Sequence, residues 1–181
     1  MFSFLVGNCH ELRLLRTSDA DELFTLTDAN RAYLRTWLPW LDSTTSSANT
    51  RDFIQSTLQQ FADDRGFVAA ICYEQSIVGV VGYNQIDWQN RIGYIGYWLA
   101  EAYQGKGLMI TSCNAIIDYG FEVLNLNRLV ITCATKNSRS RAIPERLGFI
   151  HEGTIRDAEW LYDRFVDHEI YAKLHRESIH D

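Results

Sequence analysis

The stretch Tyr103-Gln104-Gly105-Lys106-Gly107-Leu108-Met109 stands between a predicted strand, residues 91–100, and a helix predicted over 107–124. Glycines at positions 105 and 107 let the backbone turn tightly and approach a ligand without a Cβ in the way. The helix that follows points free amides and the positive end of its dipole at the turn. Such a turn binds phosphate groups through backbone donors and needs no globally basic protein.

Two better-known phosphate loops do not fit this stretch. The P-loop pattern G-x-x-x-x-G-K-[ST] is absent, and the dinucleotide fingerprint G-x-G-x-x-G would need glycine in place of Ile110. A G-x-G sequence before a helix also occurs as a tight turn that binds nothing. The stretch by itself therefore leaves both interpretations open.

Apolar periodicity on either side of the stretch predicts alternating strands and helices. Strands are predicted at residues 10–16, 67–73, 77–86, 91–100, 129–133, 149–155 and 165–174. Helices are predicted after residues 17–19 and at 49–64, 107–124 and 138–147. This order favours an α/β (mixed α+β) fold, with a mixed sheet that carries helices on both faces. With no internal repeat, linker or low-complexity tract, we expect a single domain over residues 1–181.

Charge and composition argue against several classes of function. The 181 residues carry 17 Lys+Arg and 23 Asp+Glu, a net charge of −6, whereas nucleic-acid binders present a basic face. The longest uncharged stretch, Gln75 to Ile86, is too short for a membrane helix. The four cysteines and five histidines are scattered and predict no metal site. Because the N-terminus shows no leader, we expect a cytoplasmic protein with reduced thiols.

Two motifs carry a resemblance to a known family. Residues 104–109, Q-G-K-G-L-M, are similar to Q/R-x-x-G-x-G/A, the pyrophosphate loop of the GNAT N-acetyltransferase superfamily. Residues 137–149 resemble that superfamily's second motif, N-x-x-S-x-x-x-x-E-x-L-G-F. The resemblance covers the whole chain and departs at Met109, a residue that the RimJ/RimL branch often carries there. Further segments that resemble this branch are 95–99, 119–121, 127–129, 158–160 and 167–171.

The resemblance implies the GNAT fold, a mixed sheet of six to seven strands with a V-shaped splay between central strands. It implies acetyl-CoA as cosubstrate, bound in the splay, and no metal. The pyrophosphate would lie on the amides of residues 104–108, and Asn137 and Ser140 would reach the pantetheine arm and its sulfur. The implied cofactor-binding residues are Trp98, Leu99, Gln104, Gly105, Lys106, Gly107, Leu108, Thr111, Asn137 and Ser140.

Acetyl transfer to an amine needs a neutral amine, a polarised carbonyl and a proton for the departing thiolate. The resemblance implies Glu159 as the base and Ser140 as the donor to the sulfur. Without it, Glu159 is interpreted as a surface carboxylate and Ser140 as a hydroxyl at its own helix N-terminus. A covalent intermediate on Cys113 or Cys133 is less favoured than direct attack in a ternary complex, because free cysteines are mostly small buried hydrophobes.

The implied acceptor is the N-terminal α-amine of a protein, in particular a ribosomal protein. At pH 7 roughly one α-amine in ten is neutral, against well under one lysine in a thousand, so a modest base suffices for the α-amine. A small amine, such as a polyamine, an aminoglycoside or an amino-acid analogue, is the alternative acceptor. A catalytically silent acyl-CoA-binding protein is the third hypothesis.

The acceptor side is expected at Trp37, Trp40 and Tyr97. Core packing or a dimer contact explains the tryptophan-rich segment equally well. A homodimer is expected only because members of the RimJ/RimL branch are often dimers. His151 and His168 are interpreted as strand residues that have no partner to make them catalytic.

Overall fold

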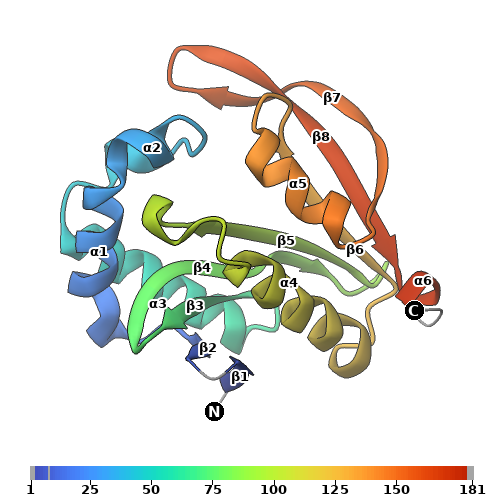
Figure 1. The fold of residues 1–181 in the computed structure, drawn as a ribbon, viewed down its shortest axis with the longest axis horizontal. Coiled ribbons are helices and arrows are strands. Elements are labelled where there is room, and N and C mark those ends of the chain that lie inside the picture. Colours follow the sequence, from blue (N-terminus) through green and yellow to red (C-terminus); the bar gives the residue numbers. More distant parts are fainter. Residues whose placement is uncertain (1–2, 8, 179–181) are drawn as a thin grey trace.

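The computed structural model describes residues 3–7 and 9–178, which fold around one mixed β-sheet (Figure 1). The strand order is β1-β2-β3-β4-β5-β6-β8-β7. Strands β5 and β6 run parallel, and the other neighbouring pairs run antiparallel. The strands are β1 (Ser3–Gly7), β2 (His10–Leu14), β3 (Phe67–Tyr73), β4 (Ser76–Asp87), β5 (Ile92–Leu99), β6 (Arg128–Ala134), β7 (Ile150–Leu161) and β8 (Arg164–Leu174).

Helices cover both faces of the sheet (Figure 1). On one face, α1 (Ala20–Ala29) and α3 (Ser47–Ala62) bury an apolar cluster against β3 and β4. On the other, α4 (Leu108–Asp118) and α5 (Ser138–Arg146) pack on the larger cluster. The remaining helices are α2 (Arg31–Arg35), α6 (His175–Ser178), the 3-10 turns η1 (Thr17–Asp19), η2 (Leu41–Ser43) and η3 (Glu101–Tyr103), and the π-helical turn η4 (Tyr119–Val123).

The predicted mixed sheet with helices on both faces is confirmed, but the expected six to seven strands is wrong, since the described chain holds eight. The additional strand is β1, whose Phe4 pairs with Leu12 of β2. Its five residues carry too short a pattern to predict a strand, and pairing with β2 orders them. The single domain over residues 1–181 stays a prediction. Its ends, residues 1–2 and 179–181, and residue 8 lie outside the described residues.

The two central parallel strands separate partway along their length. Pairing of β5 with β6 runs from Ile92 opposite Arg128 to Ile95 opposite Ile131. Beyond that point β5 continues to Leu99 and β6 to Ala134 without mutual pairing. The predicted splay between central strands is therefore confirmed.

Strand β7 is longer than predicted because it contains a bulge. Its pairing with β8 jumps from Ile155 opposite His168 to Glu159 opposite Val166, so residues 156–158 lie against Asp167 alone. A bulge of this kind re-aims the side chains that follow it. The bulge thus decides which face of the sheet carries Glu159.

Within residues 3–7 and 9–178, no helix is both long and apolar enough to cross a membrane. The same described part of the chain contains no group of three or more His, Cys, Asp and Glu side chains placed to hold a metal ion.

Candidate active site

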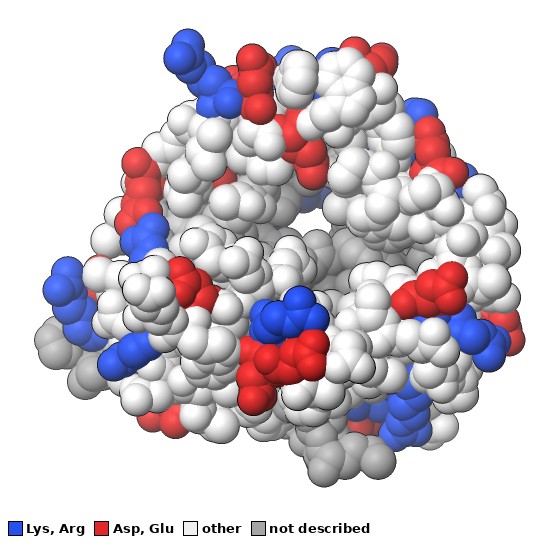
Figure 2. All heavy atoms as spheres, turned by 180° about the vertical axis from the view of Figure 1, so that it is seen from behind, with Lys and Arg blue, Asp and Glu red and all other residues white. Residues whose placement is uncertain are grey.

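A cavity of about 590 Å³ lies where β5 and β6 separate, between the glycine turn, α2 and α5. Viewed from behind, the molecule is hollowed at its centre, and mostly uncharged atoms form the walls of the hollow (Figure 2). Most of the residues predicted for the site line this cavity: Trp37, Tyr97, Trp98, Leu99, Gln104, Gly105, Gly107, Leu108, Asn137 and Ser140. The predicted residues that do not line it are Trp40, Lys106, Thr111 and Glu159.

The glycine turn has the backbone conformation that its sequence predicts. Gly105 and Gly107 have φ angles of +74° and +77°, in the left-handed region that glycine adopts without penalty. A Cβ built on either residue would meet no atom within 4 Å. Glycine is therefore required here by the backbone conformation, and the turn leaves open space in front of the first amides of α4.

The side chains around the turn form a bridge that the sequence did not predict. The amide group of Gln104 donates to the Tyr33 hydroxyl of α2, and Arg139 of α5 donates to Gln104 Oε1 over 2.7 Å. Lys106 lies outside the cavity, with its ammonium 4.9 Å from the centre of the Tyr103 ring. The Gln104 side chain thus connects the two walls of the cavity.

Thr111 also lies outside the cavity, one helical turn beyond Gly107. Its hydroxyl donates to the Gly107 carbonyl at 3.1 Å and lies 3.2 Å from His10 Nδ1. His10 Nε2 lies 2.9 Å from Ser112 Oγ, and burial lowers the pKa of this imidazole. The contacts of Thr111 in this structure therefore lie within α4 and toward β2.

The first turn of α5 faces β5 across the splay. Asn137 caps the helix, because its Oδ1 accepts the Ser140 amide over 3.1 Å. The Tyr97 hydroxyl donates to the Ser140 carbonyl at 3.0 Å, and Ser140 Oγ donates to the Tyr97 oxygen at 3.4 Å. Burial raises the pKa of the Tyr97 phenol well above 10, so it stays a donor at neutral pH. Tyr97 thereby fixes the position of Ser140 beside the cavity.

Glu159 lies on β7 directly after the bulge, and its Oε2 is 3.5 Å from His168 Nε2. His168 and His151 lie on strands β8 and β7, as predicted. Each has a carboxylate partner that the sequence did not predict, Glu159 for His168 and Glu169, at 2.5 Å from His151 Nε2, for His151. Both pairs join β7 to β8, and their residues are too far apart in sequence to predict the contacts.

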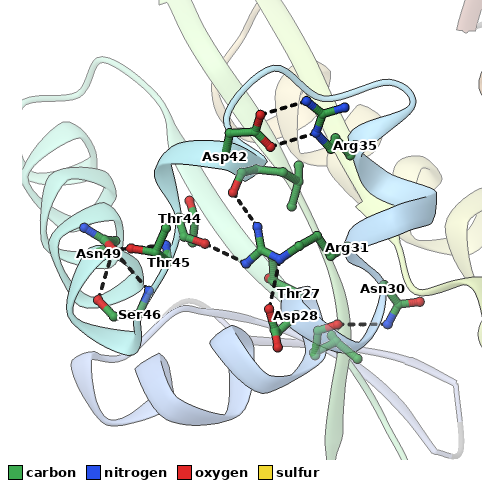
Figure 3. Close-up of polar contacts among 12 residues, drawn as sticks. Thr27, Asp28, Asn30, Arg31, Arg35, Asp42, Thr44, Thr45, Ser46 and Asn49 are labelled. Carbon is green, nitrogen blue, oxygen red and sulfur yellow. Dashed lines mark hydrogen bonds and ion pairs between the residues drawn. The ribbon is translucent and has the colours of Figure 1, made fainter. Parts of the chain in front are cut away.

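The two tryptophans of the segment 37–40 have different surroundings. Trp37 lines the cavity, whereas the ring of Trp40 packs 6.4 Å from that of Trp98. Arg31 folds the loop that follows, since it donates to the Leu41 carbonyl at 2.5 Å and the Thr44 carbonyl at 2.7 Å (Figure 3). This arginine therefore shapes the wall that carries Trp37.

Some lining residues were missed in the sequence. Tyr33 and Leu34 precede the tryptophan segment and Leu38 lies within it, and no local pattern marks them as lining residues. On α5, the lining residues Arg139, Ile143 and Arg146 recur at helical spacing around Ser140. That periodicity could have found them, because residues three or four apart share a helix face.

The two candidate nucleophilic cysteines are buried. Burial raises the pKa of the Cys133 thiol to about 11, and it raises that of Cys113 further. The reactive form of cysteine is the thiolate, which is scarce at neutral pH in such surroundings. This favours direct attack over a covalent acetyl–enzyme.

A splay between parallel strands, a left-handed glycine turn before a helix and a serine held across the splay are the features that the resemblance to acetyl-CoA-dependent acetyltransferases implies. A family model described as the acetyltransferase (GNAT) domain matches residues 11–150. The chain belongs to the GNAT acetyltransferase family, and it is an N-acetyltransferase that uses acetyl-CoA.

Individual relatives match over nearly the full length of the chain. YdaF of Bacillus subtilis, which carries the provisional name ribosomal N-acetyltransferase, is 36% identical over 98% of this chain and 97% of its own. The ribosomal-protein-serine acetyltransferase of Escherichia coli is 30% identical over 93% and 94%. RimL, a ribosomal L7/L12 α-N-protein acetyltransferase solved with coenzyme A in disulfide linkage to a cysteine, is 31% identical over 96% and 98%, with a TM-score of 0.92.

Proposed function

We propose that this enzyme acetylates the N-terminal α-amine of a ribosomal protein by direct attack in a ternary complex. The observation that carries the proposal is the full-length similarity to the ribosomal-protein-serine acetyltransferase and to RimL. The basicity of amines supports it, because an α-amine with a pKa of about 7.7–8.0 needs less help from a base than a lysine does. The same substrate implies a cytoplasmic enzyme.

The residues around the cavity fit the CoA group by their chemistry. The open turn at Gly105 and Gly107 leaves the first amides of α4 free for a pyrophosphate, as helix N-termini bind phosphate groups. Of the further residues proposed to hold the cosubstrate, Trp98, Leu99, Asn137 and Ser140 line the cavity. In this proposal Lys106 binds the cosubstrate through its backbone, and Thr111 acts as part of the N-terminal end of α4. Acetyl-CoA supplies the thioester that the acceptor amine attacks.

The proposed proton transfers use Glu159 and Ser140. Glu159 takes one proton from the attacking amine as the new N–C bond forms. Ser140 Oγ gives one proton to the sulfur as the C–S bond breaks, and the serine recovers it from water. The products are an amide and a free thiol. Ser140 supports this role through its position at the cavity, where Tyr97 orients it.

We propose that Trp37 and Tyr97 contact the acceptor or the acetyl group, because both line the cavity. Trp40 supports that wall by packing on Trp98. A homodimer is part of the proposal, since the edge strand β7 exposes the apolar side chains of Ile150, Ile155 and Trp160. Sedimentation should give the mass of a dimer, and a monomer at all concentrations would contradict it.

The proposal is tested by mixing the purified protein with isotope-labelled acetyl-CoA and salt-stripped ribosomal proteins, and locating the label by mass spectrometry. Label on the α-amine of one ribosomal protein is the expected result. Label on lysines would contradict the argument from amine basicity. If acetyl-CoA binds and no protein is labelled, a small amine becomes the better acceptor, and polyamines, aminoglycosides and amino-acid analogues are tested next.

The residue roles are tested with Glu159→Gln and Ser140→Ala. Each variant should lower kcat by about 10²-fold, the lower end of what a positioned acid or base contributes. A nearby surface carboxylate, Asp163, offers a matched control as Asp163→Asn. If kcat of both site variants stays within twofold of the wild type, the assignment of base and acid is wrong.

A further inference from the structure

We propose that His168 is a positioning residue for Glu159 and that it holds the Glu159 carboxylate toward the acceptor. This proposal rests on the role of Glu159 in the proposed function. The motifs in the sequence give His168 no role in the reaction. The proposal is carried by a contact of 3.5 Å between His168 Nε2 and Glu159 Oε2, which lie on the neighbouring strands β8 and β7.

The bulge in β7 creates this contact. Pairing places Ile155 opposite His168, and after three bulged residues Glu159 stands opposite Val166. Asp157 holds the bulge, with a left-handed φ of +49° and a backbone N–H that donates to Asp167 Oδ1 at 2.8 Å. Residues paired directly across two strands share a face, and so do residues two apart on one strand. Glu159 and His168 therefore share one face of the sheet.

That face is the one opposite α5. Tyr171 and Glu169 alternate with His168 along β8, and the Tyr171 hydroxyl bonds both Arg141 and Glu145 of α5. The face that carries His168 is open beside it, because Thr132 is exposed although it lies on the central strand β6. Since β5 and β6 separate here, an acceptor that approaches from this open face reaches the splay from the side opposite α5.

The surroundings of His168 make Glu159 its charged partner. On β6 the residues that share its face are Thr132 and Ala134, and neither titrates. Asp167 and Glu169, its neighbours along β8, have their carboxylates bound to the Asp157 amide and to His151. The side chains of His168 and Glu159 are 19% and 29% exposed, so their interaction is less screened than that of a surface pair.

The proton that leaves the acceptor amine moves in two steps. The carboxylate of Glu159 takes a proton from the acceptor nitrogen as the N–C bond forms, and it then releases this proton to water. A ring N–H of His168 at Nε2, aimed at Glu159 Oε2, orients this oxygen toward the acceptor during both steps.

The test compares His168→Ala and His168→Gln in the full chain, with the acceptor that the labelling experiment identifies. We expect His168→Ala to lower kcat on the order of 10-fold with an unchanged KM for acetyl-CoA. Glutamine keeps a hydrogen-bond donor near the carboxylate, so it should restore the KM for the acceptor and part of kcat. His151→Ala is the matched control, because it removes the other imidazole–carboxylate contact between the same strands.

The decisive comparison is the double variant. If His168 acts through Glu159, adding His168→Ala to Glu159→Gln lowers kcat less than twofold further. Losses that multiply, or a kcat for His168→Ala within twofold of the wild type, would overturn the proposal. If Glu159→Gln alone keeps full activity, Glu159 is not the base of the proposed function. That outcome differs from the two outcomes above, which overturn only the role of His168.

A readout that needs no acceptor completes the test. The ring nitrogen signals of His168 in an NMR spectrum should change on Glu159→Gln, whereas those of His151 should not. Unchanged His168 signals would show that the two side chains do not interact in solution, and would overturn the proposal whatever the acceptor is.

Discussion

At the residue scale, burial decides which side chains can react. Cys133 is the last but one residue of β6 and lies beside Ser140, yet burial raises its pKa to about 11 and keeps the thiol protonated. Ser140 does not depend on ionisation, because a hydroxyl donates a hydrogen bond in its neutral form. The difference between these two neighbours explains why the serine, and not the cysteine, is assigned to the reaction.

Cys133→Ala should therefore keep kcat within about twofold of the wild type, measured by steady-state acetyl transfer at pH 7. The cavity left by one sulfur atom costs some stability, on the order of 1 kcal/mol, which urea unfolding would report. A correctly folded Cys133→Ala enzyme without activity would instead indicate a covalent acetyl–enzyme.

At the element scale, glycines serve two different purposes before and after α4. Gly107 adopts a left-handed φ in open space, whereas a Cβ on Gly120, in η4, would lie 1.9 Å from the Tyr83 hydroxyl. That hydroxyl is held in place, because Tyr83 is buried and donates to the Ile116 carbonyl at 2.8 Å. The first glycine is required by conformation and the second by space.

We expect Gly107→Ala to destabilise the protein by about 1 kcal/mol and to raise the KM for acetyl-CoA, because the turn must present the α4 amides. Gly120→Ala should cost about 1–3 kcal/mol through overpacking, with little change in that KM. Chemical unfolding and steady-state kinetics of the two variants check this contrast. Equal effects on KM would contradict the separation of the two roles.

The strand pair β7–β8 carries a pH-sensitive contact on its α5 side. Hydrogen bonds from His151 and then Thr154 hold the pKa of Glu169 below its ordinary value of 4.5. A carboxylate with a lowered folded-state pKa stabilises the protein above its ordinary pKa, and this contribution is lost as the pH falls through the lowered value. The contact therefore stabilises the fold at neutral pH and fails in acid.

Unfolding free energies measured between about pH 3 and 7 should fall toward acid more steeply in the wild type than in Glu169→Gln. Glutamine keeps the size of the side chain and removes its titration. Identical slopes for the two proteins would show that Glu169 does not contribute to acid sensitivity.

At the scale of the whole molecule, the hairpin between β7 and β8 contacts the tryptophan segment, residues 37–40. The Tyr162 hydroxyl, in the turn between β7 and β8, donates to the Leu38 carbonyl at 2.6 Å. The guanidinium of Arg35 lies 3.9 Å from the centre of the Tyr162 ring and pairs with Asp42 (Figure 3). The hairpin and the tryptophan segment are thus held together as one wall.

Tyr162→Phe keeps the ring beneath Arg35 and removes the hydrogen bond to Leu38. We expect the KM for the acceptor to rise several-fold while the KM for acetyl-CoA stays unchanged, because only the acceptor wall loosens. Steady-state kinetics with each substrate varied in turn measures both constants. A rise in the KM for acetyl-CoA alone would place the effect on the other side of the splay.

The sequence by itself determined most of the strands and helices and the glycine turn. A left-handed φ at Gly105 and Gly107 and apolar periods depend on residues close together in the chain, so local chemistry predicts them. The motif resemblance added Glu159 and Ser140 as candidates, with no account of what contacts them.

The tertiary structure decided everything that joins distant residues. The splay, the link from Tyr97 to Ser140 and the contact of Glu159 with His168 depend on strand register and on a bulge, which place side chains on one face or the other. A shift of one residue in register moves a side chain to the opposite face, and no local pattern encodes that shift. For this reason the partners of the candidate base could be found only in the folded chain.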